Sequence, residues 1–301
     1  MKVTIVGNGR VGSAIAFTVV LRRLAHEIVL VGRTPDSAAG DAADLAHASA
    51  LSQPIIVRSG GAESAAGSDV IILTASNAKT LVPGDRLSQT AANAELFADL
   101  VPRLVRYCPG AVYLVVTNPV DIMTFLTLKY AAGVLPPSRV FGTGTLIDTA
   151  RYRTLLADYV GIHTNDIRAY ILGEHGETQF PALSAASAGG QRLDPADPTF
   201  AQLGDRARTE GHRVFAAKGY TNYAIAAATG MLLDAISTNA RSVFPVSTLL
   251  TDYHGVSNVC LSVPAVVGRS GILRVLNVDL SDGEVARLRA SADAVSKATP
   301  R

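Results

Sequence analysis

The sequence predicts an α/β fold in which a doubly wound parallel sheet is followed by a region of α+β structure. Short apolar runs rich in valine and isoleucine alternate with longer helical segments through the first 143 residues. A glycine-rich turn joins the first of these runs to the first helix. After residue 143 the alternation ends, and long helical segments precede the remaining strands. The chain of 301 residues is long enough for two such lobes.

The first predicted strand, residues 3–6, leads into a turn with three glycines and then into an apolar helix over residues 13–21. In a Rossmann dinucleotide-binding site, Gly7 permits the tight turn, Gly9 lets a pyrophosphate approach the backbone, and Gly12 lets the helix pack on its strand. Free amide groups at the helix start face the anion. An ordinary turn that binds no anion is the alternative. The surrounding strand and helix favour a dinucleotide site, whose predicted contacts are Gly7, Gly9, Arg10, Val11 and Gly12.

The residues after the second predicted strand, 28–31, bear on which dinucleotide is bound. In such sites an acidic residue about 20 positions past the glycines accepts the ribose 2′-hydroxyl, whereas an arginine suits a 2′-phosphate. This chain reads Gly32-Arg33-Thr34 there. Arg33 would pair with a phosphate and Thr34 would donate a hydrogen bond to it. The sequence therefore predicts a preference for NADP; if Arg33 is only a solvated loop cation, the cofactor is NAD.

Strands and helices continue to alternate after this loop. Because ligands of open α/β sheets sit at the carboxyl ends of strands, Thr74 and Ala75 are predicted to contact the cofactor. The polar loop that follows ends in Pro83-Gly84-Asp85-Arg86, which we expect to act as a lid; an exposed surface turn is the alternative. We expect helices over 36–50, 87–107 and 120–130, and strands over 54–57, 70–74, 112–116 and 140–141.

Asn118 lies at the carboxyl end of the predicted strand 112–116, in the segment Thr117-Asn118-Pro119-Val120-Asp121. That position is close to where a nicotinamide would lie, so Asn118 is a predicted cofactor and substrate contact. Asn118 would also serve as the N-cap of the next helix. Pro119 fixes the backbone here, with either a cis or a trans peptide bond.

Three further residues form a candidate catalytic group. Asp148 and Arg151 are three positions apart on a predicted helix and project from one face, as surface ion pairs also do. His175 lies between two glycines in Leu172-Gly173-Glu174-His175-Gly176, outside any periodic apolar segment. An exposed histidine without a role is the alternative. Beside a nicotinamide, His175 would exchange a proton with a carbonyl oxygen, and Asp148 would hold the imidazole. Arg151 offers a planar fork for a carboxylate, and Arg86 would polarise the carbonyl.

The remaining sequence completes the predicted organisation into a dinucleotide-binding domain over 1–143 and a catalytic α+β domain over 144–301. Helical periodicity covers 203–238 with a break near Gly219-Tyr220-Thr221; strands are expected near 256–263 and 273–276, and an amphipathic helix over 282–297.

The net charge of +2 excludes a polyanionic partner such as nucleic acid, and no apolar run is long enough to span a bilayer. Cys108 and Cys260 give neither metal spacing nor a disulfide framework. With a first strand by residue 3, we expect a cytoplasmic protein without bound metal.

These motifs, taken together, resemble the L-lactate/L-malate dehydrogenase family from residue 3 to about 295. Within that family, the sequences of the loop before Arg86 and of residues 142–146 are most similar to the L-2-hydroxyisocaproate dehydrogenase branch. The resemblance implies that His175 is the proton donor and acceptor, Asp148 its partner, Arg151 the carboxylate ligand and Arg86 the loop arginine. It also places Asn118 near carbonyl and nicotinamide and Thr221 beside the substrate. It implies hydride exchange with an L-2-hydroxy acid, and a homodimer or homotetramer.

Two departures from the family leave alternatives open. The acidic residue that most members carry after the second strand is replaced by Gly32-Arg33, and the loop 77–83 has an unusual length. Ala78, Leu81 and Val82 favour an apolar substrate side chain, whereas Lys79 would suit a second carboxylate, as in a malate-like enzyme. An imine reductase and a cofactor-binding protein without catalysis are the other hypotheses. Arg153 and Arg168 stand near positions where some bacterial relatives bind a phosphorylated activator, although such arginines are commonly ion-paired.

Overall fold

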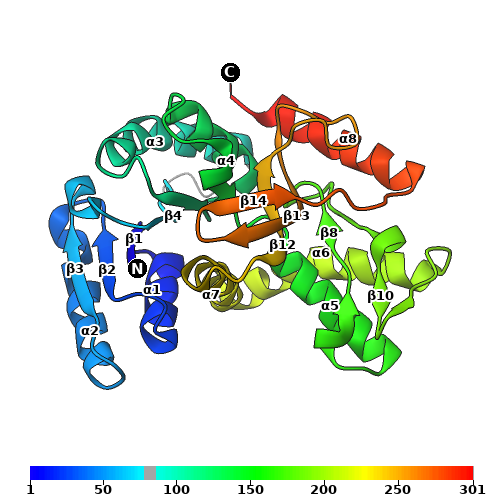
Figure 1. The fold of residues 1–301 in the computed structure, drawn as a ribbon, viewed down its shortest axis with the longest axis horizontal. Helices are drawn as coiled ribbons and strands as arrows, with labels where there is room; N and C mark the ends of the chain where they lie inside the picture. The colour runs from blue at the N-terminus through cyan, green and yellow to red at the C-terminus, as the bar shows by residue number, and fades with distance from the viewer. Residues whose placement is uncertain (78–85, 301) are drawn as a thin grey trace.

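The structure is a computed structural model that describes residues 1–77 and 86–300 (Figure 1). The first half contributes six strands to one sheet: β1 (Lys2–Val6), β2 (Glu27–Val31), β3 (Ile56–Gly60), β4 (Val70–Leu73), β5 (Val112–Val115) and β6 (Val140–Gly142). They lie in the order β3-β2-β1-β4-β5-β6, and all neighbours among them are parallel. This is the Rossmann order, so the predicted doubly wound parallel sheet is confirmed.

The apolar sequences of these strands follow from burial on both faces of the sheet. Every residue of β4 and β5 is buried, and the strands carry Val, Ile, Leu and Tyr side chains there. The helices of the first half are α1 (Arg10–Arg22), α2 (Ala39–Ala50), α3 (Arg86–Tyr107) and α4 (Val120–Tyr130). The turn η1 (Pro35–Ala38) precedes α2, so the helix expected from residue 36 begins as a 3₁₀ turn.

The second half adds three antiparallel strands to the same sheet: β12 (Ser242–Leu249), β13 (Cys260–Gly268) and β14 (Gly271–Val275). β12 meets β6 in antiparallel register at Ser247 and Gly142. In the described chain the sheet therefore has nine strands, in the order β14-β13-β12-β6-β5-β4-β1-β2-β3. The parallel part is continuous with the α+β part through this β6–β12 contact.

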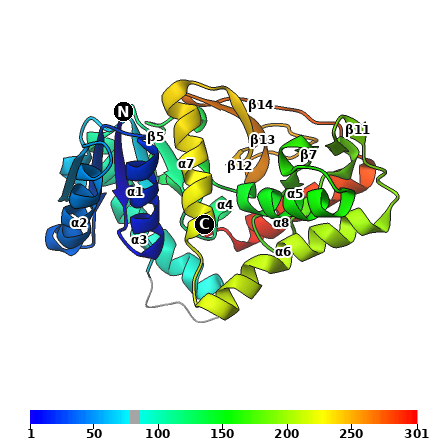
Figure 2. The ribbon, with the colours of Figure 1, turned by 90° about the horizontal axis from the view of Figure 1, so that it is seen from below.

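The other elements of the second half surround this extension (Figures 1 and 2). α7 (Tyr223–Thr238) packs beside α1, and α6 (Pro198–Lys218) runs along α5 (Leu146–Val160). The closing helix α8 (Asp282–Ala298) contacts α4 and β13. Two small sheets complete the described fold; their strands are β7 (Ile167–Arg168), β8 (Ile171–Leu172), β9 (Phe180–Pro181), β10 (Ser187–Ala188) and β11 (Gln191–Arg192).

Two predicted strands begin at other residues in the structure, and one strand was not predicted. The strand expected over 54–57 is β3, which begins after Pro54, a residue that has no amide hydrogen for the ladder. The strand expected near 256–263 is β13, because residues 253–256 form a turn that precedes it. β12 was not predicted, since it contains Pro245. That proline faces Pro264 of β13, at a position where neither residue has an amide hydrogen to donate.

Among the described residues, no helix is both long enough and apolar enough to cross a membrane.

Candidate active site

The glycine turn between β1 and α1 is shaped by close backbone contacts. Gly7 has a φ of +100°, and a Cβ there would lie 2.6 Å from the amide nitrogen of Ala75. A Cβ on Gly12 would collide with the carbonyl oxygen of Gly7. The hydroxyl of Thr74 donates to the carbonyl oxygens of Val6 and Gly7 at 3.0 and 2.7 Å. The end of β4 thus holds the turn in place, as the strand, turn and helix order predicts.

The same turn leaves room for an anion. A Cβ built on Gly9, the N-cap of α1, would meet no atom of the described residues within 4 Å, apart from its own chain neighbours. The amides of the first helical turn, from Arg10 to Gly12, precede the first intrahelical donor at Ser13. Open space in front of a helix N-terminus that carries no acidic residue in its first turn fits a dinucleotide pyrophosphate.

The loop after β2 is packed against this turn. Gly32 lies so close to Ser37 that a Cβ would collide with its hydroxyl oxygen, and Thr34 with Ser37 forms a capping box on η1. Arg33 and Thr34 are exposed. The side-chain amide of Asn8 donates to Ser37 O at 2.8 Å and to Asp41 Oδ2 at 2.9 Å. Arg33 makes neither hydrogen bond nor ion pair with another residue that the structure describes.

Asn118 follows β5, which is separated from β1 and its glycine turn by β4. Its peptide bond to Pro119 is cis, and its carbonyl oxygen accepts a hydrogen bond from Asn93 Nδ2 at 2.8 Å. The side chain of Asn118 is exposed. The N-cap of α4 is Pro119, so the alternative that Asn118 caps this helix is wrong. Its amide remains available at the edge of the sheet where ligands bind.

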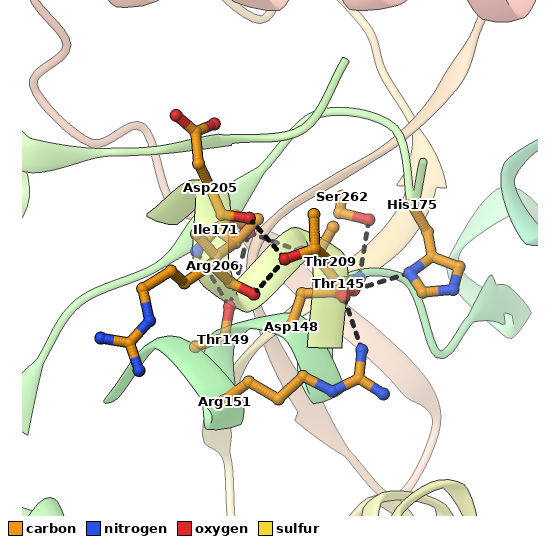
Figure 3. A network of polar contacts seen from close by, with 10 residues as sticks. All are labelled: Thr145, Asp148, Thr149, Arg151, Ile171, His175, Asp205, Arg206, Thr209 and Ser262. Carbon is orange, nitrogen blue, oxygen red and sulfur yellow. Dashed lines mark hydrogen bonds and ion pairs between the residues drawn. The ribbon is translucent and has the colours of Figure 1, made fainter. Parts of the chain in front are cut away.

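The candidate catalytic group comes together from α5 and the loop between β8 and β9 (Figure 3). His175 Nδ1 lies 2.6 Å from Asp148 Oδ2, and Arg151 Nη1 donates to Asp148 Oδ1 at 3.1 Å. The Asp148 side chain is only 3% exposed, whereas those of Arg151 and His175 are 21% and 29% exposed. The carboxylate is thus buried between two cationic partners that reach the surface, unlike a solvated surface pair.

The electrostatics of this group follow from its burial and pairing. Burial alone would raise the pKa of Asp148, but the charge and hydrogen bond of His175, with the charge of Arg151, hold that pKa below its ordinary value. Burial alone would lower the pKa of His175, and Arg151 opposes protonation as well. The Asp148 carboxylate outweighs both, so the pKa of the imidazole is raised. The result is a histidine whose protonated form is favoured, with Asp148 fixing its Nδ1 side.

The backbone of the histidine loop is held by three separate elements. Gly173 forms a two-way backbone bridge with Ser262 of β13, and Glu174 N donates to Ser291 Oγ of α8 at 2.7 Å. His175 N donates to Asp121 Oδ2 of α4, also at 2.7 Å. Each of these three anchors is buried. The imidazole is therefore carried on a backbone whose position is set on three sides.

The chain matches the lactate/malate dehydrogenase NAD-binding domain over residues 1–142 and the α/β C-terminal domain of the same family over residues 145–299. It is 38% identical to an L-lactate dehydrogenase of Gloeobacter violaceus, over 97% of this chain and 90% of the relative. It is 40% identical to an L-lactate dehydrogenase of Thermus aquaticus, over 97% of this chain and 96% of the relative. The chain belongs to the lactate/malate dehydrogenase family. It is therefore an oxidoreductase with a nicotinamide dinucleotide-binding domain.

A solved structure supports the same conclusion. The minor L-lactate dehydrogenase of Enterococcus mundtii, crystallised with ligands bound, superposes with a TM-score of 0.91 at 31% sequence identity. The superposition covers 99% of this chain and 96% of that one. The predicted family and fold class are confirmed. The similarity to the hydroxyisocaproate branch stays a prediction.

Thr221 of this dehydrogenase lies at the junction between α6 and α7 and is exposed. The neighbouring Tyr220 ring lies 4.3 Å from the Arg10 guanidinium carbon of the glycine turn and 4.5 Å from Lys218 Nζ. The Arg10–Tyr220 contact joins the α6–α7 junction to the glycine turn. Thr221 directly follows Tyr220 in the chain and makes no hydrogen bond with the described residues, so its place beside the substrate stays a prediction.

Two predicted residues of the dehydrogenase site are not placed. Arg86 is the first residue of α3, but its side chain lies outside the part of the chain that the structure describes. Lys79 also lies outside the described residues, together with Ala78, Leu81 and Val82. The lid and its specificity residues therefore remain predictions from the sequence.

Arg153 and Arg168, the predicted effector contacts, have internal partners. Arg153 Nε donates to Ala169 O at 2.8 Å, and its guanidinium carbon lies 5.2 Å from the centre of the Tyr170 ring. Burial lowers the pKa of Arg153. Arg168 Nη1 donates to Asn165 O at 2.8 Å. Both guanidinium groups thus bind the fold itself, and Arg168 remains exposed.

Several residues that shape the dehydrogenase site were not predicted from the sequence. Asp121, Ser262 and Ser291 hold the histidine loop, although each lies 54 or more residues from it in the sequence. Gly211 of α6 lies against Arg151: a Cβ there would be 3.1 Å from Arg151 Nη1. A polar residue inside an otherwise apolar strand, such as Ser262 in β13, is the signal that would have indicated a buried hydrogen bond.

Proposed function

We propose that this protein is an L-2-hydroxyacid dehydrogenase that moves a hydride between a nicotinamide cofactor and an L-2-hydroxy acid and its 2-oxo acid. The observation that carries the proposal is the chain of contacts from Arg151 through Asp148 to His175. A hydroxyacid dehydrogenase needs a proton donor and a carboxylate ligand side by side, and this group supplies both. Its relatives are named L-lactate dehydrogenases, which supports the same substrate class.

The proposed mechanism assigns the proton to His175. When bound, the reduced nicotinamide supplies the hydride that adds to the carbonyl carbon of the 2-oxo acid. His175 gives its Nε2 proton to the carbonyl oxygen as the new C–H bond forms, so the product is the hydroxy acid and a neutral imidazole. Asp148, at Nδ1, stabilises the imidazolium before the transfer and fixes the ring orientation. In the oxidative direction His175 removes the hydroxyl proton.

The other predicted residues bind and orient the substrate in this proposal. Arg151, whose guanidinium is partly exposed beside His175, takes the substrate carboxylate in a bidentate hydrogen bond. Asn118 hydrogen-bonds near the carbonyl and the nicotinamide, and Thr221 lies beside the substrate. Arg86 polarises the carbonyl when the lid excludes water. Gly7, Gly9 and the first turn of α1 bind the pyrophosphate.

For the substrate side chain we propose an apolar group. The support is the loop sequence with Ala78, Leu81 and Val82, and the name of the relatives, whose substrate carries a methyl group. A malate-like enzyme would instead use Lys79 for a second carboxylate. The apolar-substrate enzyme and the malate-like enzyme would reduce different 2-oxo acids, so rates measured on both kinds of substrate distinguish them.

For the cofactor we propose a preference for NADP. The support is Arg33, which is exposed and without partners among the described residues, and the absence of an acidic residue in Gly32-Arg33-Thr34. The opposing observation is Asp41, which Asn8 holds at the glycine turn. A carboxylate near a 2′-phosphate would repel it.

The test of the function is a set of initial rates on 2-oxo acids with side chains from methyl to isobutyl, and one with a terminal carboxylate, each with NADPH and with NADH. We expect reduction of the apolar substrates, with the higher kcat/KM for NADPH. Absence of any 2-oxo acid reduction would overturn the function. A preference for the carboxylate-bearing substrate, or for NADH, would overturn only the corresponding specificity.

Replacing Arg33 tests the cofactor proposal by itself. An Arg33→Ser variant should raise the KM for NADPH about 10- to 100-fold, since a hydrogen bond to a charged group contributes about 1.5–3 kcal/mol. The KM for NADH should stay the same. The control is Arg58→Ser, which removes another exposed arginine on the neighbouring strand β3. An unchanged KM for NADPH in Arg33→Ser would make Arg33 a loop cation only.

For assembly and location we propose a cytoplasmic homodimer or homotetramer. Phe17 and Leu21 of α1 and Met231 of α7 are exposed apolar side chains on two helices that pack side by side, which supports contact with a second copy. Cys108 and Cys260 are both free and buried, in keeping with a reducing compartment. Sedimentation equilibrium of the purified protein measures the oligomer size.

A further inference from the structure

We infer that Asp121 is a second positioning residue for His175: it holds the backbone of His175 while Asp148 holds the ring, and its negative charge favours the imidazolium. The inference rests on the proposed function of His175 as proton donor. Asp121 lies in the first turn of α4, and its Oδ2 accepts the His175 amide hydrogen at 2.7 Å. The backbone amide of His175 therefore donates to a carboxylate, although a neutral acceptor would be enough to hold the loop.

The surroundings of Asp121 are energetically unfavourable for a charged carboxylate. The residue is 2% exposed, and its Oδ1 atom is fully buried without a hydrogen-bond partner among the described residues. The hydroxyl of Ser247 on β12 is also buried; it lies close enough to Asp121 to favour the charged carboxylate, although the two do not form a hydrogen bond of good geometry. Burial raises the pKa of Asp121 to about 6, although the Ser247 hydroxyl and the His175 amide oppose the rise. An incompletely paired buried carboxylate reduces stability, which favours a functional reason for the charge.

The charged groups around this carboxylate define its effect. Glu174, in the same loop, opposes the ionisation of Asp121, and His175 favours it. The thiol of Cys260 on β13 is also close; burial and the Asp121 charge raise its pKa, which keeps the thiol neutral. His175 itself faces Asp148, Asp121 and Arg151. Of these, both carboxylates raise the pKa of His175 and Arg151 lowers it.

The consequence concerns the reductive direction, in which His175 must start protonated. The rate of 2-oxo acid reduction therefore falls as the pH rises through the pKa of the imidazole. A charged Asp121 raises the pKa of the imidazole and so moves that fall to higher pH. A purely structural explanation also exists, because an acidic residue in a first turn stabilises the helix N-terminus. The two explanations differ in what they predict for the pKa of His175.

The test uses Asp121→Asn, which keeps an oxygen acceptor for the His175 amide but removes the charge. The matched control is Thr124→Val, another isosteric change at a buried residue of α4, whose hydroxyl donates to Val120 O within the helix. The readout is the ¹H–¹³C NMR titration of the His175 ring without substrate, assigned by the signal missing in His175→Gln. Asp121→Asn should lower the pKa of His175 by about 1 unit, the size expected for a nearby charge. Thr124→Val should leave it unchanged.

The kinetic readout distinguishes the same alternatives. In Asp121→Asn, the fall of kcat/KM for 2-oxo acid reduction should begin at lower pH, with activity retained on the acid side. A rate lowered equally at every pH, an unchanged His175 pKa, or an equal shift in Thr124→Val would overturn the inference. Because the titration needs no substrate, it gives a result even if the proposed reaction is not found.

A second variant covers the case in which Asp121→Asn does not fold. Ser247→Ala leaves Asp121 in place but removes the hydroxyl that favours its charged form. More of Asp121 is then protonated near pH 6 to 7, and the pKa of His175 should fall in the same direction. A His175 pKa equal to that of the unaltered protein would overturn the inference.

Discussion

At the scale of single residues, the chemistry depends on one buried carboxylate between two cations. Asp148 is removed from water, and both of its oxygens are used, one by His175 and one by Arg151. Removing either cation would leave a buried charge incompletely paired. The Arg151 pair was predictable because residues three apart share a helix face. Contact with His175, 27 residues away, has no such local signal; it was predicted from the chemistry of a carboxylate that orients a histidine and from the family resemblance.

A lysine at position 151 tests how the substrate carboxylate is bound. Arg151→Lys keeps the charge but loses the planar fork, so it should raise the KM for the 2-oxo acid about 10- to 100-fold by the loss of one charged hydrogen bond. Steady-state kinetics on the preferred substrate measure this.

The control for that substitution is Arg206→Lys on α6. Arg206 is exposed and points away from His175 (Figure 3). The KM of the Arg206→Lys variant for the 2-oxo acid should therefore equal that of the unaltered protein. Normal substrate binding by Arg151→Lys would contradict the bidentate contact.

At the scale of elements, α6 shapes the site through the absence of a side chain. Gly211 faces the guanidinium of Arg151, and a Cβ there would lie 3.1 Å from Nη1. Glycine in a helix interior costs about 1 kcal/mol relative to alanine. A glycine fits this position despite its lower helix stability, because any larger residue would displace the Arg151 guanidinium. Helix periodicity predicted α6 from residue 203, but Asp197 as N-cap and Pro198 at the first position start it five residues earlier.

Filling that position separates stability from substrate binding. Gly211→Ala should stabilise α6 by up to about 1 kcal/mol while raising the KM for the 2-oxo acid several-fold, because Arg151 is displaced by a few tenths of an ångström. Thermal unfolding and steady-state kinetics report the two effects.

Gly283→Ala in α8 is the matched control, since a Cβ there meets no atom of the described residues within 4 Å beyond its own helix backbone and chain neighbours. It should change stability alone. A KM unaffected by Gly211→Ala would show that Arg151 tolerates the added methyl group.

At the scale of the whole molecule, the sheet and the site differ in how far the sequence predicts them. The alternation of apolar runs and helices, with the glycines at 7, 9 and 12, predicts six parallel strands and the cofactor edge, because these depend on local patterns. β12 escaped prediction because Pro245 interrupts its pattern. Asp121, Ser262 and Ser291 escaped it because their contacts with the histidine loop join β13 and two different helices. Long-range hydrogen bonds leave no periodic signal.

The central claim is that His175, held by Asp148, exchanges the proton in hydride transfer. The most direct measurement is the rate of the chemical step in His175→Ala, in single turnovers of 2-oxo acid reduction, with cofactor affinity measured in the same samples. We expect a rate about 10² to 10⁴ times lower, the usual contribution of general acid–base catalysis, with unchanged cofactor binding. A His175→Ala variant that reduces the substrate at the full rate would contradict the claim.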